Sequence, residues 1–142
     1  MWSDTNVERN GMALPLSALD LVPLVSGGTS VAALRNAAEL AQAVDRFGYT
    51  RLWYAEHHNM LGIASTTPEI LIAHVGSLTR RIRLGAGGVM LPNHSPLKVA
   101  ESYKLLEAIH PGRIDPWDRP RAGHRWPDGT CATPLARSVG RG

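Results

Sequence analysis

Four chemically active side chains, Glu56, His57, His58 and Asn59, follow directly after the apolar stretch Thr50 to Ala55. That stretch has the composition of a β-strand. Parallel α/β folds gather their catalytic and binding groups at the carboxyl ends of strands. An imidazole, whose ordinary pKa is about 6.5, exchanges a proton readily near neutral pH. The cluster therefore predicts an acid–base or binding site at the end of this strand.

The residues alone leave the roles within this cluster open. Adjacent strand residues point to opposite faces, so only one of His57 and His58 can face the interior of the fold. A purely structural histidine pair is the alternative. Glu56 either serves the site, by orienting an imidazole or contacting a ligand, or is a buried carboxylate paired with an arginine. No metal is expected, because adjacent histidines diverge on a strand and no helical histidine pair at i and i+4 follows.

A second unusual stretch, Gly85-Ala86-Gly87-Gly88, lies within a later apolar run. Three glycines in four residues weaken a strand, so the position indicates a close backbone approach or an unusual torsion. The alternative is a β-bulge that holds no ligand. His94 and His110 stand beside prolines at expected helix boundaries and are interpreted as capping groups, and Asn93 as a turn residue.

Hydrophobic periodicity predicts alternating strands and helices that position these groups. The expected strands are 16–25, 50–55, 81–92 and 113–115, and the expected helices are 31–47, 68–79 and 96–109. Strand starts near Ser17, Thr50, Ile82 and Arg113 are separated by 33, 32 and 31 residues. This near-constant period predicts a parallel sheet with right-handed crossovers. Eight such units make a (β/α) barrel of roughly 250 residues, and this chain holds three units and the start of a fourth.

Each expected helix has a predicted buried face. In helix 31–47 apolar residues recur at spacings of three and four, and they are Leu34, Ala37, Ala38, Ala41, Val44 and Phe47. In helix 96–109 the expected inner face consists of Val99, Ala100, Tyr103, Leu106 and Ile109. Helix 68–79 is largely apolar, so neighbours are expected to cover most of its circumference.

Composition and charge exclude several classes of function. The 142 residues are 44% hydrophobic, which suits one domain over residues 14–115 between a loose leader, 1–13, and a disordered tail, 116–142. No apolar run of membrane-spanning length and no signal peptide is evident, so a cytoplasmic protein without membrane contact is expected. Residues 1–115 carry ten Lys or Arg and ten Asp or Glu, so the net charge of +3 comes from the tail. This balance argues against nucleic-acid binding.

Three motifs in order resemble the luciferase-like, flavin-dependent monooxygenases, the family of bacterial luciferase. They are A-E-H-H-N at Ala55 to Asn59, G-A-G-G-V-M-L-P-N-H-S-P-L at Gly85 to Leu97, and L-L-E-A-I-H-P-G-R-I-D at Leu105 to Asp115. The resemblance covers about residues 14–115. It implies the N-terminal three to four strand-helix units of a TIM-type (β/α) barrel. It also implies an enzyme in which reduced FMN, or a deazaflavin, and oxygen oxidise a small organic substrate.

The same resemblance implies roles for particular residues. His57 aligns with the family's active-site histidine, and His58 is then its supporting hydrogen-bond partner. The expected cofactor-binding residues are Glu56, Ala86, Gly87, Gly88 and Met90. Gly87 and Gly88 stand where family members carry a non-proline peptide bond, often cis, against the flavin ring. Assembly into a homo-oligomer is compatible with this reading.

The resemblance ends after Asp115. Family members continue with a stretch of the type L-G-x-G-R-A, whose arginine helps to hold the flavin phosphate, whereas this chain reads Pro116-Trp117-Asp118. A reading frame shifted by one nucleotide would restore a family-like stretch, so we hypothesise that the tail is frame-shifted. The chain is then expected to be an inactive fragment that binds flavin weakly or not at all.

There are two alternatives to the interpretation of the chain as an enzyme. One is a small α/β module that assembles through its exposed sheet edge without a cofactor. The other is a nucleotide-binding doubly wound domain, which is disfavoured because Ser26-Gly27-Gly28-Thr29-Ser30 replaces the G-x-G-x-x-G fingerprint after the first strand.

Overall fold

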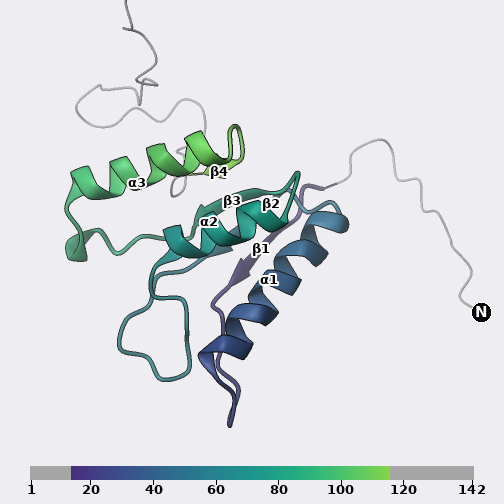
Figure 1. The fold of residues 1–142 in the computed structure, drawn as a ribbon, viewed down its shortest axis with the longest axis vertical. Helices are drawn as coiled ribbons and strands as arrows, with labels where there is room; N and C mark the ends of the chain where they lie inside the picture. Colours follow the sequence, from purple (N-terminus) through teal and green to yellow (C-terminus); the bar gives the residue numbers. More distant parts are fainter. Residues whose placement is uncertain (1–13, 116–142) are drawn as a thin grey trace, which may run out of the picture.

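The computed structural model describes residues 14–115, which form strands and helices in strict alternation (Figure 1). The predicted leader 1–13 and the predicted tail 116–142 lie outside the described residues. The elements are β1 (Ser17–Asp20), α1 (Ser30–Arg46), β2 (Arg51–Tyr54), α2 (Pro68–Leu78), β3 (Arg83–Ala86), the 3-10 helix η1 (Leu91–Asn93), α3 (Pro96–Ile109) and β4 (Ile114–Asp115). The predicted order of elements is therefore confirmed, with shorter strands than expected.

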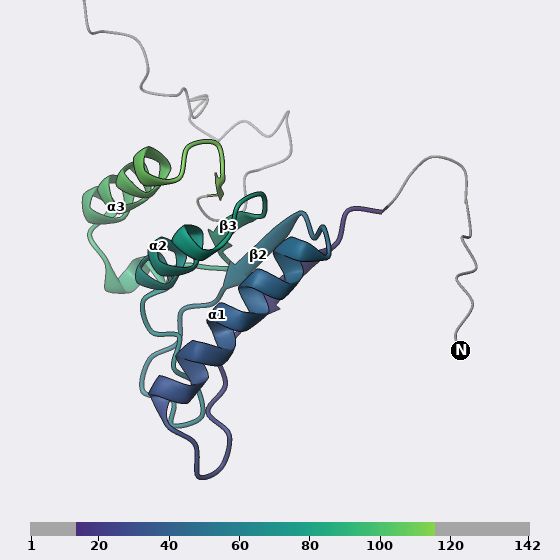
Figure 2. The ribbon, with the colours of Figure 1, turned by 45° about the vertical axis from the view of Figure 1, so that its right-hand side comes forward.

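The four strands form one parallel sheet in the order β1-β2-β3-β4. Its register places Leu19 beside Trp53, and Trp53 beside Gly85. The three α-helices cover one face of this sheet, as the two ribbon views agree (Figures 1 and 2). The parallel pairing confirms the predicted sheet. Connecting helices that all lie on one side are what crossovers of a single hand produce between consecutive parallel strands.

The core lies between the sheet and the three helices. Strand residues of β2 and β3 that point toward the helices are fully buried, and they are Leu52, Tyr54, Leu84 and Ala86. They pack in one hydrophobic cluster with Ile72 and Val75 of α2 and with residues of α1 and α3. The opposite face carries Leu19, which is 57% exposed.

Helix α1 begins and ends where local signals place it. The side chain of Thr29 accepts a hydrogen bond from the backbone N–H of Ala32 (3.2 Å), and Gly48 takes a positive φ of 77° after the last turn. The predicted buried face is partly wrong. Leu34 is 38% exposed and Phe47 is 79% exposed, because the helix turns its alanines to the sheet and ends before Phe47. The buried residues are Ala33, Ala37, Ala41, Val44 and Asp45.

The other two helices are less covered than predicted. Helix α2 buries one side, including Leu71, Ile72 and Val75, while Ile70 is 66% exposed. Helix α3 buries Val99, Tyr103 and Leu106, whereas Ala100 and Ile109 are exposed. The sheet lies on only one side of each helix, so the outward side of each stays in solvent. No helix among residues 14–115 combines the length and the apolar character that a membrane span requires.

The third strand ends earlier than predicted. Strand β3 stops at Ala86, and the chain leaves the sheet at the cis peptide bond between Gly87 and Gly88. The backbone N–H of Met90 then donates to the carboxylate of Glu56 (2.7 Å) and not to a neighbouring strand. The stretch predicted as the rest of the strand is instead a loop followed by the single turn of η1.

Candidate active site

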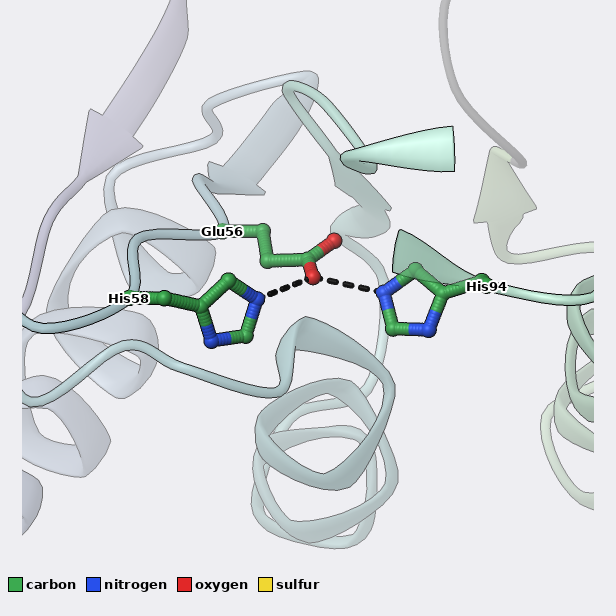
Figure 3. Close-up of side chains that lie close together, drawn as sticks. All are labelled: Glu56, His58 and His94. Carbon is green, nitrogen blue, oxygen red and sulfur yellow. Dashed lines mark hydrogen bonds and ion pairs between the residues drawn. The ribbon is translucent and has the colours of Figure 1, made fainter. Parts of the chain in front are cut away.

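Glu56 is the buried centre of a polar cluster at the carboxyl end of β2 (Figure 3). Its side chain is 1% exposed. One carboxylate oxygen, Oε1, lies 2.6 Å from Nε2 of His58 and 2.6 Å from Nε2 of His94. The other oxygen, Oε2, accepts the hydrogen bond from Met90. Glu56 therefore joins the loop after β2 to the loop after β3.

The electrostatic state of Glu56 follows from these contacts. Burial alone would raise its pKa, but the N–H of Met90 and the two imidazoles favour the charged form, and the net effect is a lowered pKa. The carboxylate is therefore ionised at neutral pH. The expected alternative of an arginine partner is wrong, because histidines take that place.

The backbone of His57 is hydrogen bonded, whereas one nitrogen of its ring has no partner among the described residues. Its N–H donates to the carbonyl of Ser65 (2.9 Å), and the Ser65 hydroxyl donates to the carbonyl of Ala55 (2.6 Å). Nδ1 of His57 is buried, and no group within residues 14–115 forms a hydrogen bond with it. The expected support of His57 by His58 is therefore wrong, because the His58 ring bonds Glu56 instead. Sequence reasoning missed Ser65, since a serine in a linker of small residues carries no distinguishing signal.

Gly87 lies on the sheet face that the helices leave open. Its N–H donates to the carbonyl of Tyr54 (2.8 Å), and the carbonyl of Gly88 accepts from the N–H of Glu56 (3.3 Å). A Cβ added to Gly87 would lie 3.2 Å from Cβ of Trp53 and 3.6 Å from Cδ1 of Leu19. A cavity of about 340 Å³ is lined by Leu19, Trp53, Ala86 and Gly87. The close backbone approach indicated by the glycines is thus made against Trp53.

The structure brings the expected site residues other than His57 into two adjoining groups, and His57 belongs to neither of them. Glu56, His58 and Met90 form the polar cluster, while Ala86 and Gly87 line the cavity with Leu19 and Trp53. Gly88 connects the two groups through its hydrogen bond with the Glu56 backbone.

The interpretation of His94 and His110 as capping groups has to be corrected. The backbone N–H of His94 does close η1 by donating to Leu91 (3.0 Å), but its ring binds Glu56 and caps nothing. The reason is the early end of β3, which returns the chain to the end of β2. His110 needs the same correction: its backbone N–H closes α3 by donating to Leu106 (2.8 Å), but its ring lies 3.1 Å from the carbonyl of Ala73 in α2.

A larger cavity, of about 570 Å³, lies at the other end of the sheet, where α1 and α2 end. Its lining includes Asp45, Arg80 and Arg81. The Asp45 carboxylate is already used there by the backbone N–H groups of Arg80, Arg81 and Ile82. Because ligands of parallel α/β folds bind at the carboxyl ends of strands, the smaller cavity beside Gly87 is the better candidate.

The lineage of the chain is established by its sequence. The sequence model of the luciferase-like monooxygenases matches residues 18–115. The chain belongs to the luciferase-like monooxygenase family. A luciferase-like monooxygenase of Escherichia coli is 46% identical over 102 residues, a match that covers 72% of this chain and 30% of that protein. The chain spans about a third of the length of the curated relatives it matches.

Solved structures agree with the luciferase-like assignment. The protein in the crystal structure of apo-MsnO8 is 47% identical in sequence to this chain, and the two structures superpose with a TM-score of 0.71. The match covers 72% of this chain and 31% of that one. The oxygenating constituent of 3,6-diketocamphane monooxygenase from Pseudomonas putida, in complex with FMN, is 23% identical with a TM-score of 0.70. That match covers 74% of this chain and 29% of the other, and it shows the fold alone. The described residues are therefore the N-terminal portion of the family's (β/α) barrel fold.

Proposed function

We propose that residues 14–115 form one wall of the site of a flavin-dependent monooxygenase. In this proposal reduced FMN and oxygen oxidise a small organic substrate, and a deazaflavin is the alternative cofactor. The single observation that carries it is the cavity at the carboxyl ends of β2 and β3, where bare backbone at Gly87 adjoins Trp53. Family membership and the FMN named for the Pseudomonas putida neighbour support it.

The residues at this cavity fit a planar aromatic ring. Gly87 exposes backbone where a side chain would otherwise fill the space, and Trp53 and Leu19 contribute apolar surface. A volume of about 340 Å³ falls in the range of roughly 300–1,000 Å³ that is usual for small-molecule sites. We assign Ala86, Gly87, Gly88 and Met90 to the cofactor side of the site.

His57 is the proposed acid–base group. When bound, the flavin supplies the oxidation chemistry, and the protein orients the ring, excludes water and moves a proton. The buried Nδ1 of His57 has no hydrogen-bond partner within residues 14–115, so its capacity to accept or donate a proton is not used by those residues. Ser65 fixes the backbone of His57 through the hydrogen bond to its N–H.

Glu56 and His58 act in this proposal by positioning. Both oxygens of Glu56 already accept hydrogen bonds from protein groups, so Glu56 orients the cluster, which is one of its two expected roles within the site. Through Met90 it holds the loop that carries Gly87 and Gly88, and His58 supports the carboxylate. The alternative of a cofactor-free interaction module is not favoured by membership of a monooxygenase family.

Flavin titration of the 142-residue chain tests the proposal. FMN and lumiflavin, which lacks the phosphate chain, are each titrated with protein while flavin fluorescence is followed. We expect weak but saturable quenching, because the described residues supply a ring surface from only one wall of the barrel. Gly87→Val should abolish it, whereas Gly62→Val, at a loop glycine with open space around it, should not. Quenching that is absent, or equal in both variants, would contradict the proposal.

A further inference from the structure

The polar cluster at Glu56 has the composition of a metal site. We propose that Glu56, His58 and His94 bind a divalent transition-metal ion, of which Zn²⁺ best suits the ligand set. One carboxylate and two imidazoles are the ligands of a common class of zinc site. Their ligand atoms all lie within 4.8 Å of one another. This inference does not depend on flavin binding.

Admitting the ion requires both imidazoles to move away from Oε1 of Glu56. Both histidine Nε2 atoms now lie 2.6 Å from Oε1 of Glu56. Around Zn²⁺, with bonds of about 2.0–2.1 Å, neighbouring ligand atoms stand roughly 3.3 Å apart, so each imidazole must withdraw by about 0.7 Å. The side chains of His58 and His94 are 42% and 28% exposed, which gives them room to withdraw.

The carboxylate provides the fixed charge of the site. Glu56 is 1% exposed, and the N–H of Met90 holds its second oxygen in place. Oε1 therefore points at the two imidazoles while the side chain stays anchored (Figure 3). A dication on this side would balance a buried negative charge, which favours its binding. The exposed histidine edges leave positions open for water as a further ligand.

The expected absence of a metal rested on neighbouring histidines in the sequence. The structure uses His58 with His94, which stands 36 positions later, and leaves His57 out of the set. The three ligands come from the loop after β2 and from the residue that follows η1. A bound ion would therefore tie together the two segments that border Gly87 and Gly88.

Metal titration of the untagged, chelator-treated 142-residue chain tests the proposal. Zn²⁺ binding is measured by calorimetry, and Co²⁺ is used as a visible-absorption probe of the same site. We expect one ion per chain, with Zn²⁺ raising the unfolding temperature. His58→Gln and His94→Gln should each weaken Zn²⁺ binding by more than about tenfold, since even indirect supporting groups contribute ten- to a hundredfold. Both side chains are partly exposed, so these variants are expected to fold.

His74→Gln provides the matched control, because His74 is exposed on α2 and lies outside the cluster. It should bind Zn²⁺ as the parent does. Circular dichroism establishes that each variant is folded before it is titrated. The absence of saturable Zn²⁺ binding would overturn the proposal and would show that the three side chains form only a hydrogen-bonded contact. Unchanged affinity in His58→Gln and His94→Gln, or loss of binding in His74→Gln, would also overturn it.

Discussion

The indole ring of Trp53 occupies the space in which a side chain at Gly85 would stand. A Cβ added to Gly85 would lie 2.5 Å from Cζ3 and 2.8 Å from Cε3 of that ring. The two residues are direct neighbours on β2 and β3. The glycines at 85 and 87 therefore let the large side chain of Trp53 lie against β3 on the open face of the sheet.

Gly85→Ala should destabilise the fold. The new methyl group would collide with the indole and with the backbone carbonyl of Asp115, and backbone cannot move aside cheaply. We expect a loss of about 1 to 3 kcal/mol, the usual cost of overpacking. Urea unfolding followed by circular dichroism measures it. Gly62→Ala, with no atom near the added methyl, is the control and should change stability little; equal losses would contradict the packing argument.

Ser65→Ala should loosen the backbone around His57. The Ser65 side chain is fully buried, and its hydroxyl bonds the carbonyl of Ala55 (2.6 Å). Removing the donor leaves a buried carbonyl unpaired, at a cost of about 1 to 3 kcal/mol. Amide hydrogen exchange should then become faster at His57. Ser77→Ala, which removes an exposed hydroxyl on α2, should have neither effect, and an unchanged exchange rate in Ser65→Ala would be evidence against this role.

Asp45→Asn should lower stability because one carboxylate accepts three backbone hydrogen bonds. Oδ1 accepts from Ile82 (2.7 Å) and Arg81 (3.0 Å), and Oδ2 from Arg80 (3.0 Å). An amide group would turn a donor toward one of these N–H groups. We expect a loss of about 2 to 3 kcal/mol near neutral pH, in line with hydrogen bonds to charged groups. Glu39→Gln, an exposed change on α1, is the control.

The Asp45 effect should also depend on pH in a defined direction. Burial alone would raise the pKa of Asp45, but the N–H groups of Arg80, Ile82 and Arg81 lower it below its ordinary value. Because the pKa of Asp45 is lower in the folded state, its ionised carboxylate stabilises the fold at pH values above the unfolded-state pKa of about 3.9. This stabilisation is lost as the pH falls through the folded-state pKa. The difference between the parent and Asp45→Asn should therefore shrink on acidification. A difference that stays constant or grows would contradict this.

Much of the fold could be predicted because its signals are local. The order of elements and the parallel sheet were predicted from the spacing of strand starts, from Pro68 and from Gly48 after the first helix. Buried faces were predicted less well. Leu34 and Phe47 fit a helical spacing, yet the small alanines face the sheet and Phe47 follows the end of α1. Periodicity predicts that a helix has an apolar side, but packing against the sheet determines which residues of that side are buried.

The candidate site was predictable only in part. The end of β2 and the glycine stretch were correctly singled out, because unusual residue types at a strand end are visible in the sequence. The contact between His94 and Glu56 was not predicted, because it joins residues 38 positions apart. It depends on where the chain goes after Gly87 and Gly88, which no local pattern specifies.

The most direct test of the account is an NMR titration of the isotope-labelled chain with lumiflavin, which locates even weak binding. The claim is that the flavin ring lies on the wall formed by Trp53 and Gly87. We predict saturable shifts of the Trp53 indole N–H and of the Gly87 and Gly88 amides, with the Arg80 and Arg81 amides of the other cavity unchanged. Saturating lumiflavin that leaves the Trp53 and Gly87 signals in place, or that shifts only the Arg80 and Arg81 amides, would contradict it.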